Sequence, residues 1–236
     1  TIIIGLLMKL LIISAGPGLD DVTSACGEAS DWFAECIKNT NIKISINNIY
    51  KNEDFDESAY DAWIITGSAS SVMSKENWIN KLEIKIRYAY KKNIPILGVC
   101  FGHQIISSAL GGEVIRNKKG WELGSYKLDI NKEGQINSIF KNVIIDDYFY
   151  FSHQDIVTKI PSEATELARN NMGLQSYSVG NKIFGVQFHP EFSTHIMEKY
   201  VEVRLKNGVI FKNNNIYESE SSHNIILNFI NIAKEF

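Results

Sequence analysis

In the stretch Ile96-Leu97-Gly98-Val99-Cys100-Phe101-Gly102, the pattern changes from strand to helix at Cys100. Residues 96–99 suit a short buried strand, and Phe101–Leu110 then has the apolar spacing of a helix, which Gly111-Gly112 closes. Cys100 stands at the turn between them, in a Gly-x-Cys-x-Gly pattern. In such a turn, small flanking residues allow a strained backbone that presents the central side chain at the end of the strand.

Strand-like and helical segments alternate before this turn and give way to further strands after it. Before the turn, the patterns predict strands at Lys9–Ser14, Ile42–Ile49 and Ala62–Thr66 and helices at Leu19–Asn39 and Trp78–Lys92. After it, they predict strands at Glu122–Ile130, Asp147–Phe151, Ala164–Arg169, Leu174–Val179 and Lys182–Phe188, then helices at Ser193–Lys206 and Ser222–Lys234 joined by a turn at Asn213-Asn214-Asn215. This order predicts a flavodoxin-like, doubly wound α/β fold, with a mostly parallel sheet and a small antiparallel segment within residues 113–185.

Length and composition fit one domain that spans residues 1–236. With 44% hydrophobic residues, the chain can bury a core without disulfides or a metal. The net charge is −3, and the chain lacks the basic footprint of a nucleic-acid-binding protein. The apolar start is interrupted by Lys9 and falls short of the ~20 residues that a membrane span needs. Whether the natural start is Met8, with Thr1–Leu7 as upstream or added residues, stays open.

The three cysteines are Cys26, Cys36 and Cys100, and they form no CxxC pair. Their number and spacing argue against a disulfide framework and against a zinc site. We therefore expect a cytoplasmic protein that needs neither a metal nor a cofactor and binds neither nucleic acid nor membrane.

A second motif, Gly185-Val186-Gln187-Phe188-His189-Pro190-Glu191, ends another apolar strand. In an extended backbone, residues two apart face the same side, so the Glu191 carboxylate can orient the His189 ring. A thiol nucleophile needs a base, and the base needs a group that holds its tautomer. Cys100, His189 and Glu191 supply these three roles. Taken separately, the motifs are equally compatible with a buried core cysteine and with a surface histidine beside a solvated glutamate.

Four stretches together resemble the signatures of the class I (triad) glutamine amidotransferases. They occur in that family's order and are Ile65-Thr66-Gly67-Ser68-Ala69-Ser70-Ser71-Val72, Val99-Cys100-Phe101-Gly102-His103-Gln104, Ser152-His153-Gln154-Asp155-Ile156-Val157 and Val186-Gln187-Phe188-His189-Pro190-Glu191. The resemblance covers residues 8–192. The first and third stretches look closest to the glutaminase domain of GMP synthase and to its stand-alone relatives, which include γ-glutamyl peptidases.

The resemblance implies γ-glutamyl transfer through a thioester. Cys100 would attack the side-chain carboxamide of glutamine and release ammonia, and water would hydrolyse the thioester with His189 as the base. Backbone N–H groups would stabilise the two oxyanions, at roughly 3–4 kcal/mol per donor. The resemblance places these donors at Phe101 and at the Gly67-Ser68 turn.

The same resemblance assigns the amino-acid end of the substrate to four polar side chains. They are Gln104, Ser152, Gln154 and Asp155. On residue type alone, Gln104 is an ordinary polar residue of a first helical turn, and residues 152–155 are a capped turn. The match departs from the GMP synthase pattern at Gly67-Ser68-Ala69, where that glutaminase has Gly-Gly-Pro, and this leaves the second oxyanion donor open.

No synthetase module follows Glu191 in this sequence, so three functions stay open. The first is a stand-alone hydrolase of glutamine or γ-glutamyl peptides, and the second is a glutaminase subunit that delivers ammonia to a separate synthetase partner. The third is a catalytically idle protein used for binding or regulation, which the complete set of Cys100, His189 and Glu191 disfavours.

Overall fold

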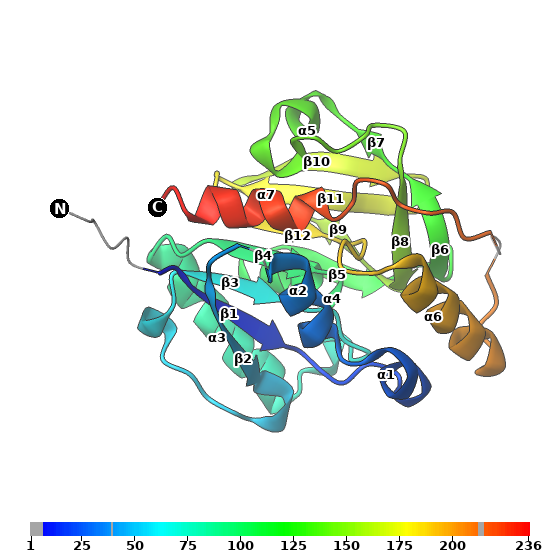
Figure 1. Cartoon of the computed structure of the whole chain (residues 1–236), viewed down its shortest axis with the longest axis horizontal. Helices are drawn as coiled ribbons and strands as arrows, with labels where there is room; N and C mark the ends of the chain where they lie inside the picture. Colours follow the sequence, from blue (N-terminus) through cyan, green and yellow to red (C-terminus); the bar gives the residue numbers. More distant parts are fainter. Residues whose placement is uncertain (1–6, 39, 212–214) are drawn as a thin grey trace.

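The protein is described by a computed structural model that covers residues 7–38, 40–211 and 215–236 (Figure 1). The expectations for the chain before Leu7 and for the turn at Asn213-Asn214 lie outside the described residues. Within these ranges, no helix is long and apolar enough to cross a membrane.

An eight-stranded sheet runs through the centre of the structure (Figure 1). Its order is β2 (Lys43–Asn48), β1 (Lys9–Ser14), β3 (Ala62–Ile65), β4 (Ile96–Val99), β12 (Ile183–Val186), β11 (Gly173–Val179), β10 (Ala164–Asn170) and β7 (Asp129–Ile130). The first five strands are parallel, and the last three continue the sheet with antiparallel pairing. The predicted α/β fold with a mostly parallel sheet is therefore confirmed.

Helices cover both faces of the sheet because successive strand residues point to opposite sides. On β1, Leu10 and Ile12 face one core with helices α2 (Ala29–Ile37) and α7 (Asn224–Ala233). Leu11 and Ile13 face a second core with α3 (Asn77–Lys91) and α4 (Phe101–Ala109). A third apolar cluster joins α1 (Asp20–Cys26) and α6 (Thr194–Lys206) to strands β6 (Glu122–Lys127) and β8 (Tyr148–His153).

The structure also differs locally from these predictions. The helix predicted for Leu19–Asn39 is two helices, because Gly27 ends α1 with φ of 84°, a value that L side chains rarely adopt. The strand predicted for Glu122–Ile130 divides into β6 and β7, which belong to different sheets. The pair β5 (Glu113–Arg116) and β9 (Asp155–Lys159) was not predicted.

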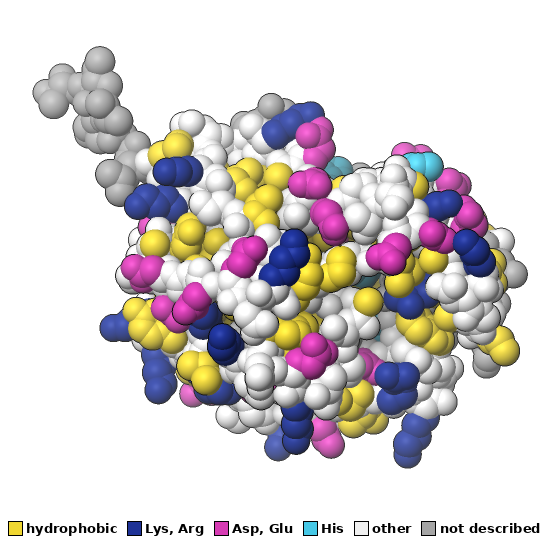
Figure 2. All heavy atoms as spheres, turned by 90° about the horizontal axis from the view of Figure 1, so that it is seen from below, with side chains coloured by type: hydrophobic (Ala, Val, Ile, Leu, Met, Phe, Trp, Pro, Cys, Tyr) yellow, Lys and Arg dark blue, Asp and Glu magenta, His cyan; other side chains and the backbone are white. Residues whose placement is uncertain are grey.

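The surface carries charges of both signs. On the face shown in Figure 2, the described Lys and Arg side chains are interspersed with Asp and Glu side chains. This distribution agrees with the small net charge of −3.

Candidate active site

Cys100 occupies a strained turn between β4 and α4. Its φ of 53° and ψ of −101° lie outside the ordinary regions for a residue with a side chain. The flanking glycines allow close packing: a Cβ on Gly98 would meet the Gly102 carbonyl oxygen at 2.4 Å, and one on Gly102 would meet the Ile65 carbonyl oxygen at 2.3 Å. The strain falls on Cys100 itself, and the glycines let helix α4 start directly against the strands.

The sheet register brings the predicted motifs to one edge. Val99 of β4 pairs with Val186 of β12, and the Cys100 N–H donates to the Val186 carbonyl at 2.9 Å. Gly67 follows the neighbouring strand β3, and a Cβ there would meet His189 Cε1 at 3.0 Å and Cys100 Cβ at 3.6 Å. Three motifs separated in sequence thus meet where parallel strands end, as open α/β sheets favour.

His189 lies between Cys100 and Glu191. Its Nδ1 is 2.8 Å from Glu191 Oε1, and both side chains are buried. Burial opposes the protonated ring, but the Glu191 carboxylate and the hydrogen-bonded Cys100 sulfur outweigh it and raise the pKa of His189 to about 10. At neutral pH this arrangement holds an imidazolium beside the Cys100 sulfur.

Aromatic rings fix the plane of the His189 imidazole. Phe192 stacks on it with centroids 4.0 Å apart, and Tyr200 stacks on the other side of Phe192 at 4.8 Å. Trp32 closes the group edge-on at 5.4 Å from Phe192. Burial raises the pKa of Tyr200, with the Glu191 and Cys100 charges acting the same way, so its hydroxyl stays neutral.

Two backbone segments adjoin Cys100. Cys100 is the N-cap of α4, and the first N–H groups of the helix, including that of Phe101, have no intrahelical acceptor. The Gly67-Ser68 turn lines the cavity with Cys100, and a Cβ on Gly67 would lie 3.6 Å from Cys100 Cβ. Ser68 Oγ accepts from the Ser70 N–H at 3.0 Å. Phe101 and the Gly67-Ser68 turn thus both adjoin Cys100.

Two hollows meet at Cys100, and both have Ser68, Cys100, Ser152 and Arg204 in their walls. The narrow hollow, of about 30 Å³, is lined also by Gly16–Leu19, His189 and Tyr200. The wide hollow, of about 160 Å³, is lined also by Trp121 and by His153–Asp155. Ser152 is buried, and its Oγ has no hydrogen-bond partner among the described residues.

The predicted substrate residues Gln154 and Asp155 are held by Ser71, which lies in the first of the four stretches, and by Arg116, which no sequence motif indicated. Ser71 Oγ donates to Asp155 Oδ2 at 2.6 Å, and Arg116 Nε donates to Asp155 Oδ1 at 2.8 Å. Arg116 also donates to Gln154 Oε1 at 2.9 Å. The Asp155 carboxylate is thus already partnered, and Arg116 places a cation at this end of the wide hollow.

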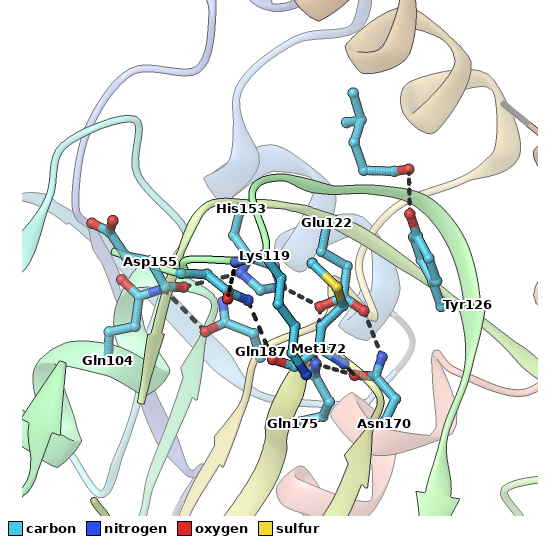
Figure 3. Close-up of polar contacts among 12 residues, drawn as sticks. Gln104, Lys119, Glu122, Tyr126, His153, Asp155, Asn170, Met172, Gln175 and Gln187 are labelled. Atoms are coloured by element: carbon cyan, nitrogen blue, oxygen red, sulfur yellow. Dashed lines mark hydrogen bonds and ion pairs between the residues drawn. The ribbon is translucent and has the colours of Figure 1, made fainter. Parts of the chain in front are cut away.

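Gln104 braces the same loop from beneath (Figure 3). Its amide nitrogen donates to the Asp155 carbonyl at 2.9 Å and to Gln187 Oε1 at 3.0 Å. His153 Nδ1 lies 3.0 Å from the same Asp155 carbonyl. The amide group of Gln104 therefore positions the loop backbone, a role that the sequence did not reveal.

The other end of this network is a fully buried carboxylate, Glu122 (Figure 3). Its Oε2 lies 2.9 Å from His153 Nε2 and accepts from Gln175 Nε2 at 2.9 Å, and its Oε1 accepts from the Asn170 amide. Buried charges persist only when they are paired and hydrogen-bonded in this way. Glu122 thus anchors the loop that carries Ser152 and Asp155.

Several of these residues had no usable sequence signal. Glu122, Arg116 and Arg204 look like ordinary surface residues in the sequence. Ser71 lies within the first of the four stretches, and Phe192 directly follows the motif with His189; these positions were their only signals. His103 lies in the first motif, but burial lowers its pKa to about 3, and its neutral ring packs on Tyr177 at 4.8 Å. Across the described ranges, no group of three or more His, Cys, Asp and Glu side chains is arranged to hold a metal.

Comparison with known proteins identifies the family of this chain. The family model "Glutamine amidotransferase class-I" matches residues 25–207. The chain belongs to this family. A glutamine amidotransferase-like protein of Schizosaccharomyces pombe is 30% identical over 216 residues, which cover 82% of this chain and 83% of the relative. The predicted family membership is confirmed.

Two further relatives of this amidotransferase carry more specific names. Gamma-glutamyl peptidase 4 of Arabidopsis thaliana is 33% identical over 68% of this chain and 65% of its own length. A glutamine-hydrolysing GMP synthase subunit of Sulfurisphaera tokodaii is 36% identical over 61% of this chain and 73% of its own length. Among solved structures, a glutamine amidotransferase of Methylobacillus flagellatus has a TM-score of 0.77 at 16% identity and covers 96% of both chains, which supports the fold.

Proposed function

We propose that this amidotransferase hydrolyses γ-glutamyl amide bonds by itself, with Cys100 as the nucleophile, His189 as the base and acid, and Glu191 as the orienting carboxylate. The observation that carries the proposal is the buried contact of His189 with both Cys100 and Glu191 at the point where two hollows meet. Together these groups supply a nucleophile, a proton carrier and space for a substrate on both sides.

The chemistry balances in two steps. The Cys100 thiolate forms a bond to the γ-carbonyl carbon, the C–N bond breaks, and His189 gives its proton to the leaving amine. Water then attacks the γ-glutamyl thioester while His189 takes its proton, the C–S bond breaks, and glutamate leaves. Each tetrahedral intermediate carries an oxyanion, which the N–H of Phe101 and the Gly67-Ser68 turn would stabilise.

The hollows support a division of the substrate between two sides of Cys100. The wide hollow offers the unpartnered Ser152 hydroxyl, the loop with Gln154 and Asp155, and the Arg116 cation, which suit the amino and carboxyl groups of a glutamyl moiety. The narrow hollow lies beside His189 and would take the leaving amine. Because the attacked group is the same in both, glutamine and γ-glutamyl peptides are chemically equivalent at the reacting carbon.

A second function is favoured by the GMP synthase subunits among the relatives. In that case the chain would be a glutaminase subunit whose ammonia passes to a separate synthetase partner. A third function, binding or regulation without catalysis, would leave the buried contact of Cys100 and His189 without use.

The three free thiols suit a reducing compartment, and we place the protein in the cytoplasm.

A substrate assay on the purified chain tests the proposal. The assay measures glutamate release from glutamine, γ-glutamyl dipeptides and glutathione conjugates. We expect turnover without a synthetase, with dipeptides used at least as well as glutamine. Activity that appears only after a synthetase is added would establish the subunit function instead, and inactivity under both conditions would leave the binding function.

A further inference from the structure

Arg204, on α6, is a cation without a partner beside the reactive centre. Its guanidinium lies over the Trp121 ring, 4.4 Å from the centroid. Its Nε is buried and makes no hydrogen bond, and Arg204 forms no ion pair within the described part of the chain. A negatively charged acceptor that enters the hollows can therefore gain a charge-assisted hydrogen bond from Arg204.

The position of Arg204 identifies where its partner would sit. Arg204 lies in the walls of both hollows and therefore borders Cys100, whereas Trp121 borders the wide hollow. Burial lowers the pKa of Arg204, with Tyr200 and the Cys100 sulfur acting in the opposite direction. Glu191 is engaged by His189, and the hydroxyl of Tyr200 is neutral. The Cys100 sulfur favours the charged guanidinium, but among the described residues it makes no hydrogen bond or ion pair with Arg204.

The missing partner has the chemistry of a carboxylate. The guanidinium of Arg204 lies over the Trp121 ring, and its planar fork of N–H groups matches the two oxygens of a carboxylate, which can accept from it in a bidentate manner. A neutral amide satisfies such a group less well, because charge-assisted hydrogen bonds are roughly twice as strong.

The substrate carries carboxylates at two places, and the surroundings favour one of them. The glutamyl end already faces Arg116 and the Ser152–Asp155 loop in the wide hollow. Arg204 borders both hollows, and only the narrow one also has His189 and Tyr200 in its walls. In the proposed reaction His189 gives its proton to the leaving amine, which would therefore lie on this side. When an amino acid leaves, its carboxylate is one carbon away from the scissile nitrogen and thus close to Arg204.

We propose that Arg204, held against Trp121, binds the carboxylate of the amino acid that leaves, so that the preferred substrates are γ-glutamyl amino acids with a free carboxylate. This assignment rests on the proposed hydrolysis at Cys100 and deepens it. Arg204 is then a residue that determines specificity on the leaving-group side.

The test compares two substrates that differ only at this carboxylate. The kcat/KM values of γ-glutamyl-alanine and γ-glutamyl-alaninamide are measured for the wild type and for Arg204→Met, with glutamine as a third substrate. We expect the wild type to prefer the acid by about tenfold or more, and Arg204→Met to bring the ratio close to one. Lys206→Met is the matched control on the same helix, because Lys206 is exposed and pairs with Asp21, and it leaves the ratio unchanged.

Each outcome decides the assignment. If Arg204→Met lowers kcat/KM equally for the acid, the amide and glutamine, Arg204 binds the glutamyl end or supports the fold. That result would overturn the proposed role in binding the leaving carboxylate. A wild type that is active but does not distinguish acid from amide overturns it too, while leaving the proposed hydrolysis intact. Inactivity of the wild type on every compound, with or without a synthetase, would overturn the hydrolysis first. If Arg204→Met does not fold, Trp121→Leu removes the platform and should shift the same ratio in the same direction.

Discussion

Val99 and Val186 are register partners in adjacent parallel strands, β4 and β12. The chain that follows each strand leaves the sheet at the same edge, with Cys100 one residue later and His189 three residues later. Backbone hydrogen bonds hold both residues beyond the strand ends: the Cys100 N–H donates to the Val186 carbonyl and the His189 N–H donates to the Tyr150 carbonyl. Sites built on such rigid elements hold their geometry within the narrow limits that proton transfer requires.

Replacement of the nucleophile separates chemistry from folding. Cys100→Ser should lower kcat by at least about 10⁴-fold, because a hydroxyl beside the same histidine is far less acidic than a thiol. The melting temperature should stay near that of the wild type, since the two side chains have similar size. Substantial remaining turnover of glutamine or a γ-glutamyl dipeptide would exclude Cys100 as the nucleophile.

The alkaline limb of the pH profile should report His189. Its pKa is raised to about 10, so the protonated ring persists at neutral pH and is lost as the pH rises through that value. Glu191→Gln removes a charge that raises this pKa, and kcat/KM, measured from pH 5 to 11, should begin to fall at lower pH. Glu198→Gln, on exposed α6 surface, is the control. An alkaline limb that does not move in Glu191→Gln would contradict the assigned role of Glu191.

The buried carboxylate beneath the loop should affect both stability and substrate binding. Glu122→Gln leaves one amide oxygen in place of the two acceptors that hold His153, Asn170 and Gln175. We expect the free energy of unfolding in urea to fall by about 3 kcal/mol. We also expect KM to rise more than kcat falls, because the loop with Ser152 and Asp155 loses its anchor. If Glu122→Gln and the exposed Glu198→Gln have the same free energy of unfolding, the Glu122 network does not stabilise the fold as proposed.

Thiol alkylation should distinguish the cysteines at neutral pH. Burial, followed by the charges of Glu191 and Glu35, raises the pKa of Cys36 to about 11, so its thiol stays protonated and slow to react. Iodoacetamide should therefore modify Cys100 well before Cys36, and activity should fall in step with the Cys100 adduct in a peptide map. Cys36→Ala should retain full activity. Faster modification of Cys36 than of Cys100 would show that Cys100 is not a reactive thiolate.

The regular part of the fold could be predicted because its signals are local. The strand Lys9–Ser14 has the predicted bounds, and helix α3 differs from its prediction by one residue at each end. The pairing of Cys100 with His189 and Glu191 followed from residue chemistry and from the rule that parallel strands end at one edge. The placement of these residues in space agrees with that reasoning, and their catalytic roles remain a proposal.

The parts that could not be predicted depend on contacts distant in sequence. Strand β5 is short and partly exposed, and it forms only because β9 pairs with it some forty residues later. Glu122 meets His153, Asn170 and Gln175 across 31 to 53 residues of chain, and in the sequence it looks like any strand glutamate. Burial and partner choice of this kind are properties of the packed chain, not of a short pattern.

The strained backbone at Cys100 lowers the stability of the fold at the position that carries the proposed nucleophile. With φ of 53° and ψ of −101°, the position suits glycine better than any residue that carries a thiol. Cys100→Gly should therefore melt at a higher temperature than the wild type while losing all turnover. If only thermal stability were selected, glycine would replace Cys100 over time. A cysteine kept at this position in relatives of the protein would therefore indicate selection for its chemical reactivity.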